Sequence, residues 1–323
     1  MRRREFLAAA TVTACAGLTR AADASPKQAL EVRQRETDHF DLIFQPESPR
    51  PLRILQITDT HFGSPSAKAK ELDQRSFDLI AAMVKQHQPD FINHTGDFVN
   101  NDQGPRVSYE AIDFMDGLGV PWAHSLGNHD IGAVSTEDYR QRLKQATFGY
   151  FDADDHREYS YRLDVVAPGA ERPMWTIYCF DSGSRAGSKH VSRRQLDWYG
   201  RQLERDRERE IACPAVAMIH IPVVEFHKLQ DAHAFRGIFG ERVCFESDQG
   251  GTFTRLKNAQ RVRAIFSGHD HQNDYCGDWE GVELVYGRVS GWSGYGDLER
   301  GGRLIELDPA TGSYRHRIVF ATA

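Results

Sequence analysis

Five short groups of polar residues in this chain carry side chains that bind metal ions. They are Asp59-Thr60-His61, Gly96-Asp97, Gly127-Asn128-His129-Asp130, His220 and Gly268-His269-Asp270-His271. Each group alone occurs by chance in many chains, but all five directly follow short apolar runs. Carboxylate, imidazole and amide donors together suit hard or borderline divalent cations. The series therefore predicts a metal centre assembled from distant parts of the chain.

Two cations held close together need a shared anionic oxygen and enough neutral donors to complete each coordination shell. A carboxylate suits the shared position because it has two oxygens, and imidazoles suit the terminal positions. A glycine before a ligand, as in Gly96-Asp97, lets the backbone turn sharply where a strand ends. The residue types thus allow a site for two metal ions.

The elements that must position these residues alternate along the chain. Apolar runs predict strands at residues 53–58, 90–94, 120–126, 215–219 and 263–266, each ending at one of the five groups. The spacing of apolar residues predicts helices at residues 67–88, 109–118, 136–146 and 194–210. Further strands are expected at residues 159–166, 174–180, 282–289, 303–307 and 314–320. This alternation indicates an α/β fold, in which functional groups gather at the carboxyl ends of the strands.

The composition is that of an ordinary globular protein, with 323 residues, 40% hydrophobic residues, 27% charged residues and a net charge of −6. It excludes collagen, coiled coils and disulfide-dense miniproteins. The acidic balance argues against binding of duplex nucleic acid, and no apolar run reaches the roughly 18 residues of a transmembrane helix. Residues 25–50 are polar and read as a lead-in segment. Residues 51–323 are expected to form one domain, because no repeat or composition break follows residue 50.

The first 24 residues resemble an export signal. Arg3-Arg4 followed by Glu5-Phe6-Leu7 is similar to a twin-arginine signal, and an apolar stretch and the small residues of Ala22-Asp23-Ala24 follow. We therefore expect the twin-arginine machinery to export the chain to the periplasm or beyond. Two alternatives stay open. Cys15 lies in a sequence that resembles a lipoprotein box and would then carry a lipid anchor, or the segment is a basic amphipathic helix.

Four cysteines follow this segment, at Cys179, Cys213, Cys244 and Cys276. A disulfide is permitted outside the cytoplasm, but spacing leaves all three pairings open. Buried thiols without a bridge are an equally good interpretation.

The ordered series Asp-x-His, Gly-Asp, Gly-Asn-His-Asp, His and Gly-His-x-His resembles the signature of the calcineurin-like metallophosphoesterases. The resemblance runs from about residue 54 to residue 319. Residues 220–226, 268–277, 291–296 and 300–303 are similar to a narrower group, the yeast Dcr2-type and plant purple-acid-phosphatase-29-like phosphatases. The resemblance implies a four-layer α/β/β/α sandwich with two mixed β-sheets.

The resemblance also implies which residues hold the metals. One ion would be bound by Asp59, His61, Asp97 and His271, and the other by Asp97, Asn128, His220 and His269. Asp97 would then bridge the two ions. In purple acid phosphatases a tyrosine that binds ferric iron stands three residues after the bridging aspartate, whereas this chain has Asn100 there. The departure argues against a purple diferric-type site, and the two ions are expected to be Fe, Mn, Zn or Mg.

The activity implied is hydrolysis of small phosphomonoesters by a hydroxide that bridges the metals, since coordination lowers the pKa of bound water. His129 is the expected catalytic residue, donating a proton to the leaving oxygen or stabilising charge at phosphorus. Asp130 either orients the His129 ring or caps a helix. Two alternatives to a phosphomonoesterase remain: a phosphodiesterase acting on cyclic nucleotides or small phosphodiesters, and a binding protein that retains the metals without turnover.

Overall fold

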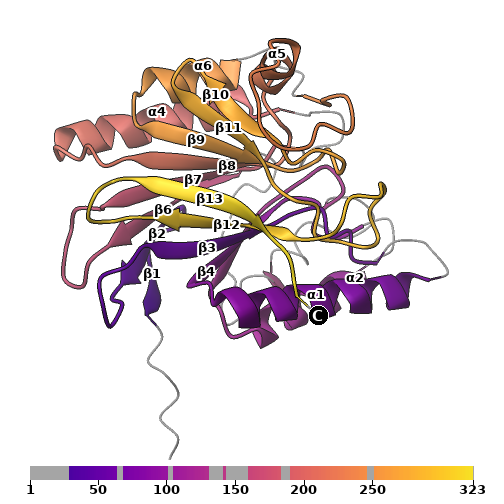
Figure 1. Ribbon diagram of the computed structural model, residues 1–323. Coiled ribbons are helices and arrows are strands. Elements are labelled where there is room, and N and C mark those ends of the chain that lie inside the picture. The colour runs from indigo at the N-terminus through magenta and orange to yellow at the C-terminus, as the bar shows by residue number, and fades with distance from the viewer. Residues whose placement is uncertain are drawn as a thin grey trace, which may run out of the picture.

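Two β-sheets lie at the centre of the computed structural model (Figure 1). The structure describes residues 29–63, 68–100, 105–130, 141–142, 159–182, 190–245 and 251–322. The export signal expected at residues 1–24, with Cys15, lies outside these ranges. All but two residues of the helix expected at residues 136–146 also lie outside them.

A five-stranded mixed sheet contains the first three ligand-bearing strands. Its order is β13-β12-β3-β4-β5, with β3, β4 and β5 parallel and β12 antiparallel to both of its neighbours. The strands are β3 (Leu52–Ile57), β4 (Phe91–Thr95), β5 (Trp122–Ser125), β12 (Gly302–Leu307) and β13 (Tyr314–Val319). β4 and β5 are buried at every residue, as expected for strands covered on both faces.

An eight-stranded mixed sheet contains the other two ligand-bearing strands, β8 and β9. Its order is β1-β2-β6-β7-β8-β9-β11-β10, and β7, β8, β9 and β11 are parallel. The strands are β1 (Leu30–Glu36), β2 (His39–Phe44), β6 (Ser160–Val166), β7 (Trp175–Phe180), β8 (Ala215–Ile219), β9 (Val262–Ser267), β10 (Cys276–Trp279) and β11 (Val282–Tyr286). Alternate residues of β8 pack into different cores, with Val216 and Met218 in one and Ala217 and Ile219 in the other. The sheet is therefore apolar on both faces.

Residues 30–44 belong to this sheet, so the prediction of a lead-in segment is wrong for them. β1 pairs antiparallel with β2, and β2 lies parallel to β6 with Asp41 opposite Asp164. The polar sequence hides these strands because β1 is an edge strand with one face in solvent. The buried carboxylate of Asp41 is compensated by ion pairs to Arg33 and Arg35.

Helices cover the outer face of each sheet. In Figure 1, α1 (Ala69–His87) and α2 (Pro105–Gly117) lie below the five-stranded sheet. α4 (Arg193–Glu208), α5 (Glu225–Asp231) and α6 (Gly251–Asn258) lie above the eight-stranded sheet. The predicted four-layer α/β/β/α sandwich is thus confirmed. A capping box of Ser192 and Gln195 begins α4.

The helices and strands predicted after residue 50 agree with the structure where it describes them. The predicted strands in residues 53–320 and the helices α1, α2 and α4 are all found, with ends shifted by a few residues. The short elements α5, α6 and β10 were not predicted. The sequence left open whether the four cysteines form a disulfide. In the structure all four are thiols, and no disulfide joins them.

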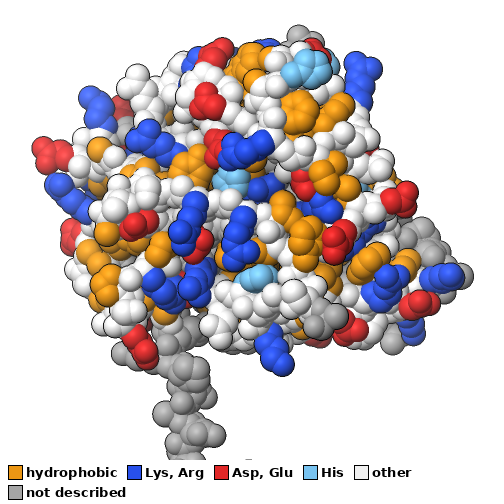
Figure 2. All heavy atoms as spheres, in the orientation of Figure 1, with side chains coloured by type: hydrophobic (Ala, Val, Ile, Leu, Met, Phe, Trp, Pro, Cys, Tyr) orange, Lys and Arg blue, Asp and Glu red, His pale blue; other side chains and the backbone are white. Residues whose placement is uncertain are grey.

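In the part of the chain that the structure describes, no helix is both long and apolar enough to cross a membrane. Acidic and basic side chains are interspersed on the face shown in Figure 2.

Candidate metal centre

The five polar groups meet where the parallel strands of the two sheets end. Within the five-stranded sheet, the backbone N–H of Asp59 donates to the carbonyl of Gly96 at 3.0 Å. Between the sheets, the backbone N–H of His269 donates to the Asp59 carboxylate at 3.0 Å. The loops after β3, β4 and β9 are therefore tied together directly.

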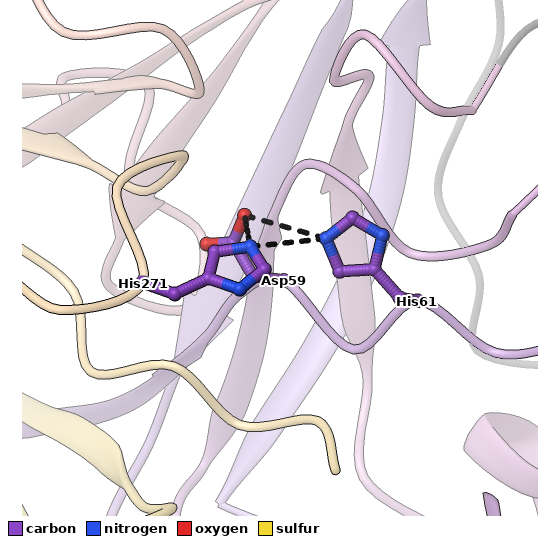
Figure 3. A group of neighbouring side chains, drawn as sticks. All are labelled: Asp59, His61 and His271. Carbon is purple, nitrogen blue, oxygen red and sulfur yellow. Dashed lines mark hydrogen bonds and ion pairs between the residues drawn. The ribbon is translucent and has the colours of Figure 1, made fainter. Parts of the chain in front are cut away.

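The first group of donors comprises Asp59, His61 and His271, whose nearest ligand atoms all lie within 4.8 Å of one another. Figure 3 shows Asp59 and His61, from the loop after β3, facing His271, from the loop after β9. His271 Nε2 lies 3.3 Å from Asp59 Oδ1 and 3.1 Å from His61 Nε2. The two imidazole nitrogens and the carboxylate oxygen thus face a common point.

The second group comprises Asp97, His220 and His269, with ligand atoms within the same distance of one another. His220 Nε2 lies 3.2 Å from Asp97 Oδ2. Asp97 also lies beside the first group, with its Oδ2 3.6 Å from His61 Nε2. Asp97 is therefore the carboxylate common to both groups, in the place expected of a bridge.

Three of the histidines are oriented by a contact on the nitrogen that faces away from the group. His61 Nδ1 lies 3.1 Å from Asn100 Oδ1, His220 Nδ1 lies 2.8 Å from the Thr95 carbonyl, and His271 Nδ1 lies 3.2 Å from the Tyr295 carbonyl. Because these partners are acceptors, each Nδ1 donates its hydrogen and each Nε2 points into the group, where its lone pair would bind a cation. Asn100 thus supports His61.

The backbone at the ligands is held in an unusual conformation. Asp59, His61, Asp97 and His269 have φ angles of 55°, 48°, 51° and 80°, in the left-handed region that costs energy for residues other than glycine. Glycine is also required at positions 96 and 127, because a Cβ at either position would overlap the side chain of His220. Such strain is common at functional sites, where the side-chain direction matters more than local stability.

The electrostatics of the group favour a bound cation. Asp59 and Asp97 are both 1% exposed, and although burial alone would raise their pKa values, neighbouring histidines hold both below the ordinary range. Burial opposes a charge on His220, but Asp97 and Asp59 raise its pKa to about 10. Among the described residues, His220 Nε2 and Asn128 Oδ1 are buried atoms with no hydrogen-bond partner. These are donors that the second metal ion would need, so the residues fit a two-metal site.

His129 lies at the mouth of the group. Its backbone N–H donates to Asp97 Oδ1 at 2.8 Å, and its exposed ring packs edge-on against His61 with centroids 5.0 Å apart. The main chain of His129 is thus fixed to the central carboxylate while its ring faces the cavity. This placement suits contact with a substrate.

Asp130 supports the loops instead of the His129 ring. Its carboxylate accepts backbone N–H groups of Phe98, Val99 and Gly127 at 2.7–3.0 Å. Burial and the charge of Asp97 raise its pKa to about 7. The hydrogen bonds of the described residues thus give Asp130 the role of joining the loop after β4 to the loop after β5.

A cavity of about 410 Å³ opens in front of these residues. Two loops that sequence reasoning did not assign form part of its wall, contributing Glu241 and Arg242 from one side and Tyr295 from the other. Residues 291–296 were noted only for their resemblance to a family pattern, and residues 241–242 follow no predicted strand. Their place at the cavity depends on long-range packing, which leaves no local signal.

Comparisons with known proteins identify a family and related sequences. A family model described as calcineurin-like phosphoesterase matches residues 52–273. "Probable inactive purple acid phosphatase 29" of Arabidopsis thaliana is 27% identical over 79% of this chain and 76% of its own length. "Phosphatase DCR2" of Saccharomyces cerevisiae is 24% identical over 69% of this chain and 44% of its own.

A solved structure shares the fold. The crystal structure of a dimetal phosphatase from Danio rerio superposes with a TM-score of 0.52 at 13% identity, covering 84% of this chain and all of that one.

Proposed function

Because the chain belongs to the calcineurin-like phosphoesterase family, we propose that it is a dinuclear-metal phosphatase that hydrolyses phosphomonoesters. From the sequence of residues 1–24 we propose in addition that it is secreted. The observation that carries the proposal is the position of Asp97 between two groups of donors. His61 and His220 both lie within 3.6 Å of its Oδ2. A single carboxylate shared in this way is what a pair of cations requires.

The donors divide into two sets. Asp59, His61, Asp97 and His271 would hold one ion, and Asp97, Asn128, His220 and His269 would hold the other. Fe, Mn, Zn or Mg suits this mixture of imidazole, carboxylate and amide. When bound, such ions neutralise charge on a phosphoryl group and lower the pKa of coordinated water.

The protein's own residues supply orientation and a proton. The overall reaction adds water to phosphorus and breaks its bond to the ester oxygen, giving an alcohol and inorganic phosphate. His129 donates a proton to the departing alcohol oxygen, since its ring is exposed at the cavity mouth and its backbone is fixed to Asp97. Burial of Asp59 and Asp97 keeps water away from the carboxylates, which strengthens their hold on cations.

The test is turnover by purified protein loaded in turn with Mn, Zn, Fe or Mg. We expect hydrolysis of p-nitrophenyl phosphate to exceed that of bis(p-nitrophenyl) phosphate. His129→Ala should retain both ions but lower kcat about 10²- to 10⁴-fold, most severely for alkyl phosphates, whose leaving groups need the proton. His87→Ala, at the far end of α1, is the matched control and should behave as wild type.

The outcomes separate the alternatives. Preference for the bis ester would make the protein a phosphodiesterase. Binding of both ions without turnover of any ester would make it a binding protein. Equal activity of His129→Ala and wild type on alkyl phosphates would remove His129 as the proton donor.

Export is a separate part of the proposal and rests on residues 1–24. Replacing Arg3-Arg4 with Lys-Lys should leave the protein in the cytoplasm, because the twin-arginine machinery reads that pair. Fractionation of cells producing the two forms measures this. Normal export of the Lys-Lys form would refute the twin-arginine route, and release of the protein from membranes by Cys15→Ser would identify a lipid anchor.

A further inference from the structure

Tyr295 is an exposed aromatic residue on the wall of the cavity that contains the metal ligands. It is 52% exposed, more than Ile238 or Phe239, the other large apolar side chains exposed in the described part of the chain. Exposing so much of an aromatic ring is unfavourable in water, and the exposed part borders the reaction centre. The residue therefore needs an explanation that packing does not give.

The ring of Tyr295 is held in one orientation from two sides. One face stacks on the imidazole of His271, with centroids 4.0 Å apart and an angle of 13° between the planes. The hydroxyl donates to the carboxylate of Glu241 at 2.9 and 3.0 Å, and Glu241 itself accepts the backbone N–H of Gln272 at 2.7 Å. The side chain thus bridges two loops and has little freedom left.

The loop that carries Tyr295 is also rigid. Buried Arg300 donates from Nη2 to the carbonyls of Gly294, Tyr295 and Gly296 at 3.0–3.1 Å, and from Nε to the carbonyl of Gly291 at 2.8 Å. Gly294 packs so closely on His271 that a Cβ there would overlap the imidazole. The ring is therefore fixed relative to the metal ligand on which it stacks.

We propose that Tyr295 is a stacking surface for an aromatic ring in the alcohol part of the substrate. The proposal rests on the proposed function, because it places the phosphate at the metal ligands and the ring of the alcohol beside them. A ring fixed before binding loses little conformational entropy when a second ring stacks on it. The cavity, at about 410 Å³, is in the size range of small-ligand sites. The substrate class is thus an aryl phosphate or a nucleotide.

A matched pair of substrates isolates the stacking. Adenosine 5′-monophosphate and ribose 5-phosphate release the same kind of primary alcohol, so that only the base distinguishes them. Wild type should have the higher kcat/KM for the nucleotide. Tyr295→Leu should reduce the ratio of the two kcat/KM values about tenfold, mainly through KM, because a base stacked on an aromatic residue is lost. Tyr295→Phe should keep most of the ratio, since the ring remains.

A second pair distinguishes the two sources of a ring. Phenyl phosphate and cyclohexyl phosphate have similar size but only the first is planar. A Tyr295-dependent preference for phenyl phosphate alone would identify aryl esters as the class, and one for the nucleotide alone would identify nucleotides. Phe239→Leu is the matched control, because Phe239 is an exposed aromatic residue that does not line the described cavity. It should leave both ratios as in wild type.

The inference fails if Tyr295→Leu changes both members of each pair equally, which is the result of a merely structural role. Binding measured by calorimetry on metal-loaded protein keeps this test independent of turnover. If wild type hydrolyses none of the four esters, the proposed function is refuted, while the ratios of their Kd values still decide whether Tyr295 stacks on a ring.

Discussion

Two of the clusters among the described residues that have the composition of a metal site differ in what neutralises their carboxylates. The first is the metal-edge cluster of Asp59, Asp97 and the histidines around them. The second, which we call the arginine cluster, contains His39, Asp41 and Asp164 on β2 and β6, with ligand atoms as close together as in the first. Residue type and distance alone do not separate the two.

Arginine separates them. In the arginine cluster, Arg162 donates to Asp164 at 2.8 and 2.9 Å and to Asp206 at 3.0 Å. Asp41 is paired with Arg33 and Arg35. In the metal-edge cluster, Asp59 and Asp97 form their ion pairs within the described part of the chain with histidines. The carboxylates of the metal-edge cluster would thus be neutralised by bound cations. Those of the arginine cluster are neutralised by arginine side chains of the protein itself.

The largest expected effect comes from neutralising one carboxylate in each cluster. Asp97→Asn should lose at least one metal ion and lower kcat/KM on the order of 10³-fold, because the shared ligand and its charge are lost. Asp164→Asn should keep the wild-type metal content and activity. Elemental analysis beside the phosphatase assay measures both. Loss of metal from Asp164→Asn would show that the arginine cluster binds an ion. It would then be wrong that arginines alone neutralise the carboxylates of that cluster.

Removing the internal cation of the arginine cluster should instead affect folding. Arg162 is 2% exposed, and Arg162→Met leaves Asp164 and Asp206 with one fewer partner each. Breaking a buried ion pair in this way costs about 3–5 kcal/mol of unfolding free energy. Urea unfolding in the presence of a chelator measures this loss. A variant as stable as wild type would mean that the guanidinium contributes nothing net.

The two clusters also differ in how far they could be predicted from the sequence. The donor residues of the metal-edge cluster could be proposed from the sequence because they lie just after apolar strands, as Asp59 follows β3 and His220 follows β8. The strand positions followed from the same apolar runs. The four-layer fold followed from the family resemblance.

The arginine cluster and the cavity wall could not be predicted in this way. The sequence of β1 is mostly polar, and the apolar residues of β2 are interrupted by Asp41, which is buried against arginines. Pairing of these strands across the sheet leaves no local pattern. Glu241 and Tyr295 lie 54 positions apart in the chain and meet only through the folded loops. Contacts of this kind depend on tertiary packing, which spacing and hydropathy do not encode.

A smaller effect on metal affinity is expected when a residue that orients a metal-binding histidine is changed. Asn100→Ala removes the acceptor that lies 3.1 Å from His61 Nδ1. Loss of such a partner typically weakens metal affinity about 10- to 100-fold, and we expect the lower figure because Asn100 is only half-buried and water can replace it. Competition with a chelator measures the affinity. Asn100→Asp, which retains an acceptor, should bind at least as tightly as wild type, and an equal loss in both variants would refute this role.

The smallest effect concerns the pH dependence of the arginine cluster. Burial alone would raise the pKa of Asp164, but hydrogen bonding to His39 and the charge of Arg162 hold it below its ordinary value of 3.8. Since the folded pKa lies below the unfolded one, ionised Asp164 stabilises the fold fully above about pH 4, and this contribution is lost as the pH falls through the folded pKa. The difference in unfolding free energy between wild type and Asp164→Asn, measured with chelator present, should therefore be constant from pH 6 to pH 5 and shrink below pH 4. A difference that does not shrink below pH 4 would mean that the folded pKa of Asp164 does not control this stability, and the distinction between the two clusters would lose its electrostatic basis.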